Sequence, residues 1–417
     1  MMNKLAAGTS TVLLCMAVPL AGCKTLDQAL NTAERTIAVT QSPTVKTLNT
    51  VARAREPEQV LKESLKGRSQ QYKSNPQLLI NDIRQAQRDY QKLMSLLGGK
   101  VSKTWGKKEV KLPSRVQYIK YTQNYMSRAV VDFDAGEITV ETVDEKDPNT
   151  SLKNAIVTTL LTPSDPRAVD LFTDSAITLT SEKDPYLLGL VLDQNKKPIA
   201  SPVEAEGFAD HLLKAQVATR EVELEGGKKQ ARYVKFAMVP NFQNKQAEKY
   251  SQAVTKFAEQ YKISPSLVYA VIRTESNFNP FAVSSAPAYG LMQLVPTSGG
   301  REAYRKARGQ DEAPSKDYLF DAENNIELGT AYLNVLTYSQ LEPVANAVSR
   351  EYCVISAYNT GPGNVLRTFS RDKVTAVNAI NSLSPSALYE KLRTSLPYEE
   401  TRHYLYKVVN YRRQFIR

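Results

Sequence analysis

Glu275 is the residue whose surroundings in the sequence most favour acid–base chemistry. It lies on an expected helix that begins at Ser264-Pro265, an N-cap followed by a proline in the first turn. The apolar residues on its face of that helix stand three and four positions apart: Val268, Val271 and Ile272. Desolvation there raises the pKa of a carboxyl group, so Glu275 would stay protonated near neutral pH, as a general acid must. The alternative for a half-buried glutamate is a structural ion pair with a cation.

Three sequence blocks, the first of which begins at Glu275, make up a longer motif. The first block covers residues 275–297 and contains Gly290-Leu291-Met292-Gln293, the second covers 357–364, and the third covers 400–404. In this order and spacing the blocks resemble the signature of the soluble-type lytic transglycosylases, a branch of the lysozyme-like superfamily. The motif is long and composite, which makes the resemblance specific.

The resemblance implies a lyase reaction on peptidoglycan strands, with Glu275 as the only catalytic carboxylate. Glu275 would protonate the glycosidic oxygen of the β-1,4 bond that joins N-acetylmuramic acid to N-acetylglucosamine. The 2-acetamido oxygen of the muramic acid would attack its anomeric carbon, and the ionised Glu275 would then accept the proton of the C6 hydroxyl. This closes a 1,6-anhydro ring without water, and substrate assistance of this kind replaces the second carboxylate of other glycosidases. The resemblance implies no cofactor, and a role in cell-wall turnover and remodelling.

The same resemblance implies a set of substrate-binding residues: Ser284, Met292, Gln293, Tyr358, Asn359, Glu400 and Tyr404. Ser284 and Gln293 match polar positions of the cleft, and Met292 matches the apolar wall beside them. Tyr358 and Asn359 match an Ala-Tyr-Asn block whose tyrosine faces the reacting sugar.

Two of these residues keep a structural alternative. Tyr404 matches a tyrosine that hydrogen-bonds the catalytic carboxyl, and it could equally be a core residue. Glu400 either contacts the peptide stem of the substrate or only holds the final helix.

Two other functions compete with the lyase. A lysozyme-type hydrolase on the same fold would use water and would need a second carboxylate or another group to position it. A wall-binding scaffold without activity would not need Glu275, which is present within an intact motif. The mass of the products separates lyase from hydrolase, because an anhydro end is one water lighter than a reducing end.

The first residues predict an exported, lipid-anchored protein. Lys4 precedes an apolar run over residues 11–20, which is too short to span a bilayer, and Leu20-Ala21-Gly22-Cys23 resembles the lipobox of bacterial lipoproteins. Acyl chains on Cys23 would anchor the protein firmly. Lys24 is not the aspartate that retains such proteins in the inner membrane, so we expect the outer membrane, facing the periplasm. The alternative is an ordinary signal peptide with an incidental cysteine.

Composition limits the partners and the chemistry. The formal net charge of +11 favours an anionic partner, and the scattering of Lys and Arg along the chain disfavours nucleic acid. Once Cys15 is removed with the leader and Cys23 is acylated, Cys353 is the remaining thiol, and the chain has two histidines. We therefore expect no disulfide and no metal site, and we interpret Cys353 as a buried, unreactive thiol.

The remaining pattern predicts an α+β protein. Residues 1–22 form the leader, and 23–105 form a lipidated helical extension whose apolar stripe over 79–97 ends at Gly98-Gly99. An antiparallel sheet is expected in an α+β domain over 106–240, and a mainly helical lysozyme-like domain over 248–417.

Short strands and turns support the sheet. Residues 130–133 and 138–141 flank one turn, 222–224 and 233–237 flank another, and 187–192 and 197–199 a third. Helices are expected over 152–161 and 205–213. The stretches 118–122 and 133–139 resemble the N-terminal domain of the membrane-bound lytic murein transglycosylase C family.

Overall fold

The computed structural model describes residues 76–177, 184–284 and 288–415, all of which belong to the unit formed by residues 71–417. Within helix α4, side chains are described at residue 88 and from residue 90 onward. The predicted leader over residues 1–22, Cys23 and the rest of residues 23–75 lie outside the described residues. No described helix is both long enough and apolar enough to cross a membrane.

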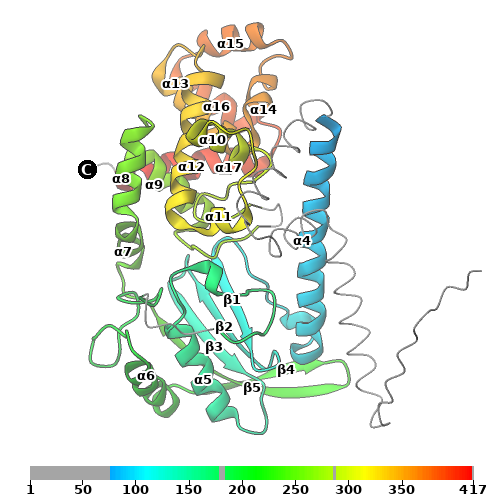
Figure 1. Ribbon diagram of the computed structural model, residues 1–417, viewed down its shortest axis with the longest axis vertical. Helices are drawn as coiled ribbons and strands as arrows, with labels where there is room; N and C mark the ends of the chain where they lie inside the picture. Colours follow the sequence, from blue (N-terminus) through cyan, green and yellow to red (C-terminus); the bar gives the residue numbers. More distant parts are fainter. Residues whose placement is uncertain (1–75, 178–183, 285–287, 416–417) are drawn as a thin grey trace, which may run out of the picture. The chain divides into compact units, whose positions relative to one another are not determined.

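A five-stranded antiparallel sheet forms the centre of the α+β region (Figure 1). Its strands occur in the spatial order β1-β2-β3-β5-β4: β1 (Gln117–Thr122), β2 (Ser127–Asp132), β3 (Glu137–Thr142), β5 (Gly227–Ala237) and β4 (Ala218–Leu224). Two of the three predicted hairpins are confirmed, β2–β3 and β4–β5. The side chain of Asp132 accepts hydrogen bonds from the backbone N–H groups of Asp134 and Ala135, which closes the β2–β3 turn.

The third predicted hairpin is wrong. Residues 187–199 form turns, with isolated bridges in place of paired strands, one of them between Leu192 and Pro198. The side chain of Asp193 accepts hydrogen bonds from the backbone of Asn195 and Lys197, and Pro198 has no N–H to donate to a ladder. Local side-chain bonds therefore close a loop where the pattern favoured strands.

Helices cover both faces of the sheet. The predicted helices α5 (Pro148–Leu160) and α6 (Pro202–Ala215) pack on one face, where alternate strand residues such as Val131, Val140 and Val234 are buried. The other face meets the last turns of α4 (Pro76–Trp105). The short helices η1 (Lys107–Glu109) and η2 (Pro166–Ala168) lie in the connections.

Helix α4 is longer than the sequence predicted, because it runs through Gly98-Gly99 to Trp105. Each glycine costs a helix about 1 kcal/mol relative to alanine. Leu97, Val101 and Trp105 stand one turn apart and are all buried against the sheet. Their burial stabilises the last turns by more than the two glycines cost, at roughly 1.5–3 kcal/mol for each large side chain.

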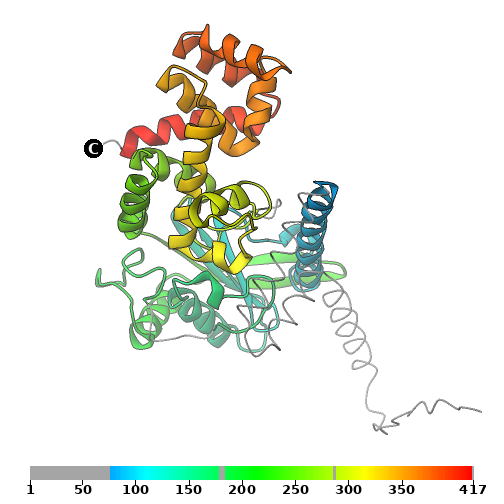
Figure 2. The same ribbon diagram turned by 45° about the horizontal axis from the view of Figure 1, so that its top comes forward.

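The helical region begins directly after the sheet. Its elements are α7 (Phe242–Lys249), α8 (Ser251–Gln260), α9 (Pro265–Ser276), α10 (Gly299–Arg308), α11 (Lys316–Phe320), α12 (Ala322–Val335), η3 (Leu336–Gln340), α13 (Ala347–Thr360), α14 (Pro362–Arg367), α15 (Lys373–Asn381), α16 (Pro385–Ser395), α17 (Glu399–Arg412) and η4 (Arg413–Phe415). They share one hydrophobic core, which runs from Ala247 to Val408. Helices α13–α16 lie at the end of this region away from the sheet (Figure 2).

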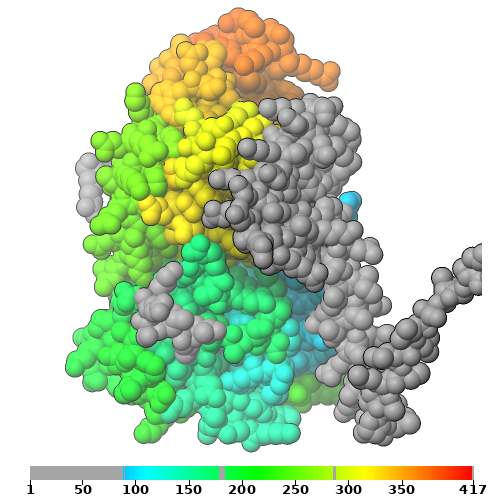
Figure 3. All heavy atoms as spheres, in the orientation of Figure 1, coloured from blue at the N-terminus to red at the C-terminus, as the bar shows by residue number. Residues whose placement is uncertain are grey.

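The two regions are in direct contact. On the face seen in Figure 3, atoms of the helical region, in yellow, lie against those of the α+β region, in green. The hydroxyl of Tyr186 donates a hydrogen bond to the carbonyl of Phe278, and Phe281 is buried in the core of the α+β region. Arg167 forms an ion pair with Asp321 across the same boundary at 3.4 Å.

Candidate active site

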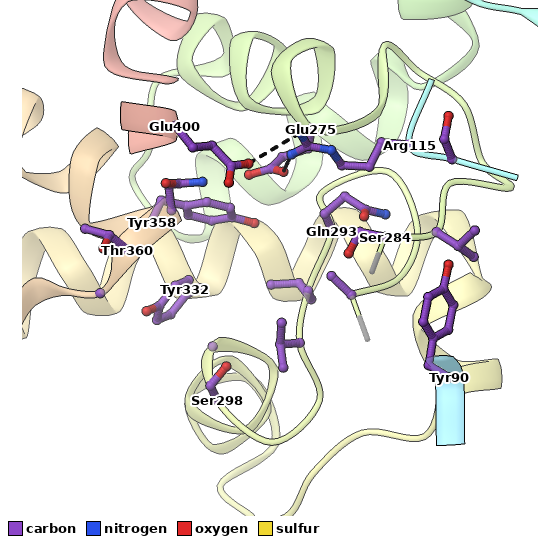
Figure 4. Close-up of a pocket in the computed structure, with 18 of the residues that line it drawn as sticks. Tyr90, Arg115, Glu275, Ser284, Gln293, Ser298, Tyr332, Tyr358, Thr360 and Glu400 are labelled. Carbon is purple, nitrogen blue, oxygen red and sulfur yellow. Dashed lines mark ion pairs between the residues drawn. The ribbon is translucent and has the colours of Figure 1, made fainter. Parts of the chain in front are cut away.

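A cavity of about 1010 Å³ lies where helix α4, the loop before β1 and the helical region meet. Figure 4 shows Glu275, Arg115 and Glu400 together at one edge, with Tyr358, Gln293 and Ser284 below them in this view. These six residues line the cavity, and so does Asn359. Six of the eight residues predicted for the cleft therefore line the cavity: Glu275, Ser284, Gln293, Tyr358, Asn359 and Glu400. The other two, Met292 and Tyr404, lie behind it.

Glu275 stands in the last turn of helix α9, which begins at Pro265 as predicted. Ser264 occupies the N-cap position, but its hydroxyl contacts that of Ser266 instead of capping the helix. Asn277 ends the helix in the left-handed conformation, with φ of 48°. Its side-chain amide donates to the carbonyl of Phe133 and to Asp134, so the β2–β3 turn of the α+β region holds the end of the helix.

Glu275 is only 5% exposed, and burial raises its pKa to about 7. The Tyr404 hydroxyl and the Arg115 guanidinium act in the opposite direction, whereas the nearby charge of Glu400 raises the pKa further. The C-terminal end of a helix carries partial negative charge, which also favours the protonated carboxyl. Near neutral pH such a group can both donate and accept a proton.

The Tyr404 hydroxyl is buried beside Glu275 and lowers its pKa. It makes no hydrogen bond of ordinary geometry to any described residue. Tyr404 does not line the cavity, so it supports the carboxyl from behind.

Arg115 is the charged neighbour of Glu275. Its Nη1 lies 3.8 Å from Oε2 of Glu275, and its Nη2 lies 3.4 Å from Oε1 of Glu400. No feature of the sequence singles out Arg115, because it follows Pro113-Ser114 outside any motif.

Gln293 and Ser284 lie on the loop that follows α9. Gln293 has a φ of 47°, and its Nε2 donates to the carbonyls of Ala282 at 3.1 Å and Gly290 at 2.9 Å. Its amide therefore holds the loop closed as well as facing the cavity. Gly290 has a φ of 74°, and a Cβ there would lie 2.4 Å from Nδ2 of Asn325, so this position requires glycine.

Met292 does not form the cavity wall that the sequence analysis assigned to it. Its side chain is fully buried against Gly329, where a Cβ would meet the Met292 sulfur at 2.2 Å. Its carbonyl accepts a 2.9 Å hydrogen bond from the hydroxyl of Tyr358. The wall itself is formed by Tyr358 and Tyr332, whose ring centroids are 5.4 Å apart.

Asn359 is fixed by a hydrogen bond from the Thr401 hydroxyl to its Oδ1, at 2.7 Å. This bond joins the end of α13 to the start of α17. Asn359 also lines the cavity.

Both regions of the chain match known families. Residues 72–249 match the family model described as membrane-bound lytic murein transglycosylase C, N-terminal domain, and residues 252–381 match the transglycosylase SLT domain. A membrane-bound lytic murein transglycosylase C from Sodalis glossinidius is 44% identical over 325 residues, which are 78% of this chain and 89% of that protein. One from Yersinia enterocolitica is 44% identical over 316 residues, 76% of this chain and 87% of that protein.

The chain belongs to the membrane-bound lytic murein transglycosylase C family.

Solved structures of soluble lytic transglycosylases are also similar to part of the chain. The 70 kDa soluble enzyme from Escherichia coli is 29% identical, with a TM-score of 0.31, over 40% of this chain and 24% of that one. The lytic transglycosylase Slt from Pseudomonas aeruginosa is 28% identical, with a TM-score of 0.31, over 39% of this chain and 23% of that one.

In this member of the membrane-bound lytic murein transglycosylase C family, helix α4 also lines the cavity. Tyr90, Gln91 and Met94 face it, and Tyr90 packs edge-on against Phe172 with ring centroids 6.3 Å apart. The sequence placed this helix in an extension of unassigned role. Its apolar periodicity predicted a helix, but not the surface that the helix would contact.

Cys353 and the two histidines do not line this cavity. Burial raises the pKa of Cys353 to about 12, and the side chain is in the core of the helical region. His211 and His403 belong to helices of different regions, α6 and α17. Among the described residues, no group of three or more His, Cys, Asp or Glu side chains is arranged to hold a metal ion.

Proposed function

We propose that this protein cleaves the β-1,4 bond between N-acetylmuramic acid and N-acetylglucosamine in peptidoglycan without water, leaving 1,6-anhydro ends. Its role is the turnover and remodelling of the cell wall. The observation that carries the proposal is the buried carboxyl of Glu275, with a pKa of about 7, at the edge of a large cavity. Membership of a lytic transglycosylase family supports the same reaction.

In the proposed reaction Glu275 begins protonated and donates its proton to the glycosidic oxygen. The leaving sugar takes the electron pair of the broken bond, and the 2-acetamido oxygen of the muramic acid attacks its anomeric carbon. The carboxylate of Glu275 then takes the proton of the C6 hydroxyl. The C6 oxygen displaces the acetamido oxygen and closes the anhydro ring, so Glu275 ends protonated, as it began.

The other residues position the sugar and the carboxyl in this proposal. Ser284, Gln293 and Asn359 offer polar groups to the substrate, and Tyr358 offers an aromatic surface. Tyr404 stabilises the ionised form of Glu275 from behind the cavity. Glu400 is 65% exposed and faces the same space, where it can contact a peptide stem.

Glu400 also gives the hydrolase alternative its one structural argument, since it is a second carboxylate at the cavity. In the present geometry its Oε1 pairs with Arg115 at 3.4 Å, so this carboxylate faces a cation of the protein, whereas a base that activates water has to face the water. The lyase therefore remains the better proposal.

The first test is mass spectrometry of the fragments that the full-length chain, in detergent, releases from purified peptidoglycan. We expect ends that are one water lighter than reducing ends. Glu275→Gln should reduce release by about 100-fold to 10,000-fold, the range of general acid–base catalysis. Glu323→Gln, on an exposed ion pair with Lys256, is the matched control and should retain activity. Reducing ends from the wild-type chain would overturn the lyase, and near-normal release by Glu275→Gln would overturn the assignment of Glu275.

Two further assignments belong to this proposal. The chain is anchored to the outer membrane by acyl chains on Cys23 and faces the periplasm; its relatives carry the description membrane-bound in their names. The domain limits are a leader over 1–22, a lipidated segment from 23, an α+β domain that ends near residue 240, and a catalytic domain over 248–417. The packing of Leu97 and Trp105 on the sheet supports counting the second half of α4 with the α+β domain.

A further inference from the structure

The loop before β1 carries Arg115 from the α+β region to the cavity. Its backbone is tied to its own sheet, because the N–H of Phe133 donates to the carbonyl of Val116 at 3.0 Å. It is also tied to the helical region. Nδ2 of Asn279 donates to the carbonyl of Arg115 at 3.1 Å, and the N–H of Val283 approaches the carbonyl of Ser114 at 3.5 Å. The position of this backbone therefore depends on the docking of one region on the other.

The guanidinium of Arg115 lies between two carboxylates. Its distances of 3.8 Å to Glu275 and 3.4 Å to Glu400 are ion-pair distances, longer than the 2.7–3.2 Å of an N–H···O hydrogen bond. Arg115 thus acts on Glu275 through its charge and leaves the carboxyl oxygens open to other partners. The dashed line in Figure 4 marks an ion pair within this group.

We propose that Arg115 is a positioning residue for the reaction of Glu275: docking of the loop over residues 113–116 on the helical region holds a cation between Glu275 and Glu400. This proposal rests on the assignment of Glu275 as the acid. It gives the α+β region a part in the chemistry, because the region supplies a charge that the helical region does not place there itself.

Four groups from three elements face the Glu275 carboxyl: Arg115 from the loop, Glu400 and Tyr404 from α17, and Tyr358 from α13. Burial is the largest effect and raises the pKa of Glu275, and Glu400 raises it further. Tyr404 and Arg115 lower it. Without Arg115 the negative charge of Glu400 would act on Glu275 with no compensation, and the pKa of Glu275 would rise. Without Glu400 the pKa would fall.

Removing Arg115 and removing Glu400 should therefore shift the pKa of Glu275 in opposite directions. The experiment that tests this is the pH dependence of kcat/KM of the full-length chain on soluble glycan strands. Activity is lost at high pH as Glu275 loses its proton, so the alkaline limb reports the pKa of Glu275 in the free enzyme. Arg115→Gln should move this limb upward by roughly half a pH unit or more, the size expected for a partly exposed ion pair. Glu400→Gln should move it downward. Arg115→Lys keeps the charge and should stay near the wild-type limb.

Arg167→Gln is the matched control. Arg167 is in the same region, its side chain is 40% exposed like that of Arg115, and it also pairs with a carboxylate of the helical region, Asp321 at 3.4 Å. It does not line the cavity, so its removal takes away one ion pair between the regions without changing the charges that face Glu275, and the limb should stay in place.

An unmoved limb in folded Arg115→Gln would overturn the proposal, as would equal losses at every pH in Arg115→Gln and Arg167→Gln. If Arg115→Gln does not fold, the double variant Arg115→Gln/Glu400→Gln, which also removes the partner carboxylate, decides: its limb should lie above that of Glu400→Gln, and equal limbs would overturn the proposal. Failure of the Glu275 assignment is recognised separately, because Glu275→Gln would then be active.

Discussion

Glu275 shows how the requirements of catalysis and of stability conflict at a single residue. The carboxyl lies in the last turn of helix α9, is only 5% exposed, and has the buried Tyr404 hydroxyl beside it. Burial raises its pKa to about 7, which suits proton transfer near neutral pH. The same shift means that ionising Glu275 in the folded protein costs free energy.

Because the pKa of Glu275 is raised by folding, the free energy of unfolding should depend on pH. The pKa of Glu275 is about 7 in the folded protein against a reference value of 4.5. Between these values the unfolded chain loses the proton while the folded protein keeps it, so the free energy of unfolding falls as pH rises. The total loss is about 3 kcal/mol, fully present above pH 7 and absent below pH 4.5.

Glu275→Gln should therefore be about as stable as the wild type near pH 4.5 and more stable by up to about 3 kcal/mol at pH 8. Denaturant unfolding at the two pH values measures the difference. Glu323→Gln, at an exposed ion pair, should change stability by less than about 1 kcal/mol at both. A Glu275→Gln variant that gains no stability at the higher pH would show that the carboxyl is not held protonated by burial.

At the scale of elements, helix α4 links the sheet to the cavity. Its last turns are buried on the sheet through Leu97, Val101 and Trp105, and its middle places Tyr90 and Met94 at the cavity. The Trp105 indole also donates to the carbonyl of Tyr125 at 2.7 Å and packs against the Arg128 guanidinium, 3.9 Å from the ring centroid. Packing at one end of the helix thus fixes the position of the other.

Two neighbouring leucines of α4 test this packing with the same substitution. Leu97 is 1% exposed and Leu96 is 44% exposed. Leu97→Ala should lower the free energy of unfolding by about 2–5 kcal/mol, as expected when a fully buried leucine leaves a cavity. Leu96→Ala should change it by about 0.5 kcal/mol or less. Denaturant unfolding measures both, and equal effects would contradict the packing of the helix on the sheet.

At the scale of the whole molecule, the net charge and the proposed lipid anchor both favour a position between a membrane surface and the cell wall. A net charge of +11 attracts an anionic polymer such as the cell wall over distances of about a Debye length, near 8 Å at physiological salt. An acylated Cys23 would hold the protein at a membrane surface beside that polymer. The two features together limit where the proposed cleavage takes place.

Cys23→Ala should block acylation and remove the protein from the outer-membrane fraction. Cys15→Ala, in the part of the chain that the proposal assigns to a cleaved leader, is the matched control and should leave fractionation unchanged. Lys24→Asp should shift the protein to the inner membrane if the residue after the cysteine directs sorting. Membrane fractionation with a high-salt wash measures all three, and retention of Cys23→Ala in the outer membrane after the wash would show that the lipid is not the anchor.

Much of the fold followed from patterns between near neighbours in the sequence. The start of α9 at Pro265, the apolar face that leads to Glu275, and the turn at Asp134 all depend on residues within one or two turns of each other. Helical spacing, capping and turn chemistry act over that range, so they can be recognised without tertiary contacts. They also failed where local and tertiary effects compete, as at Gly98-Gly99, where burial outweighs helix propensity.

The surroundings of Glu275 were decided by the tertiary structure. Arg115 reaches it from the other region, Tyr90 lines the same cavity from α4, and Met292 is buried below the wall it was expected to form. Neither periodicity nor a motif specifies any of these contacts, since each depends on how distant segments dock. The sequence determined which residue we propose as the acid. The docking of the α+β region on the helical region determined which charges surround that residue, because a pKa is set by the groups within a few ångströms in space, whatever their distance along the chain.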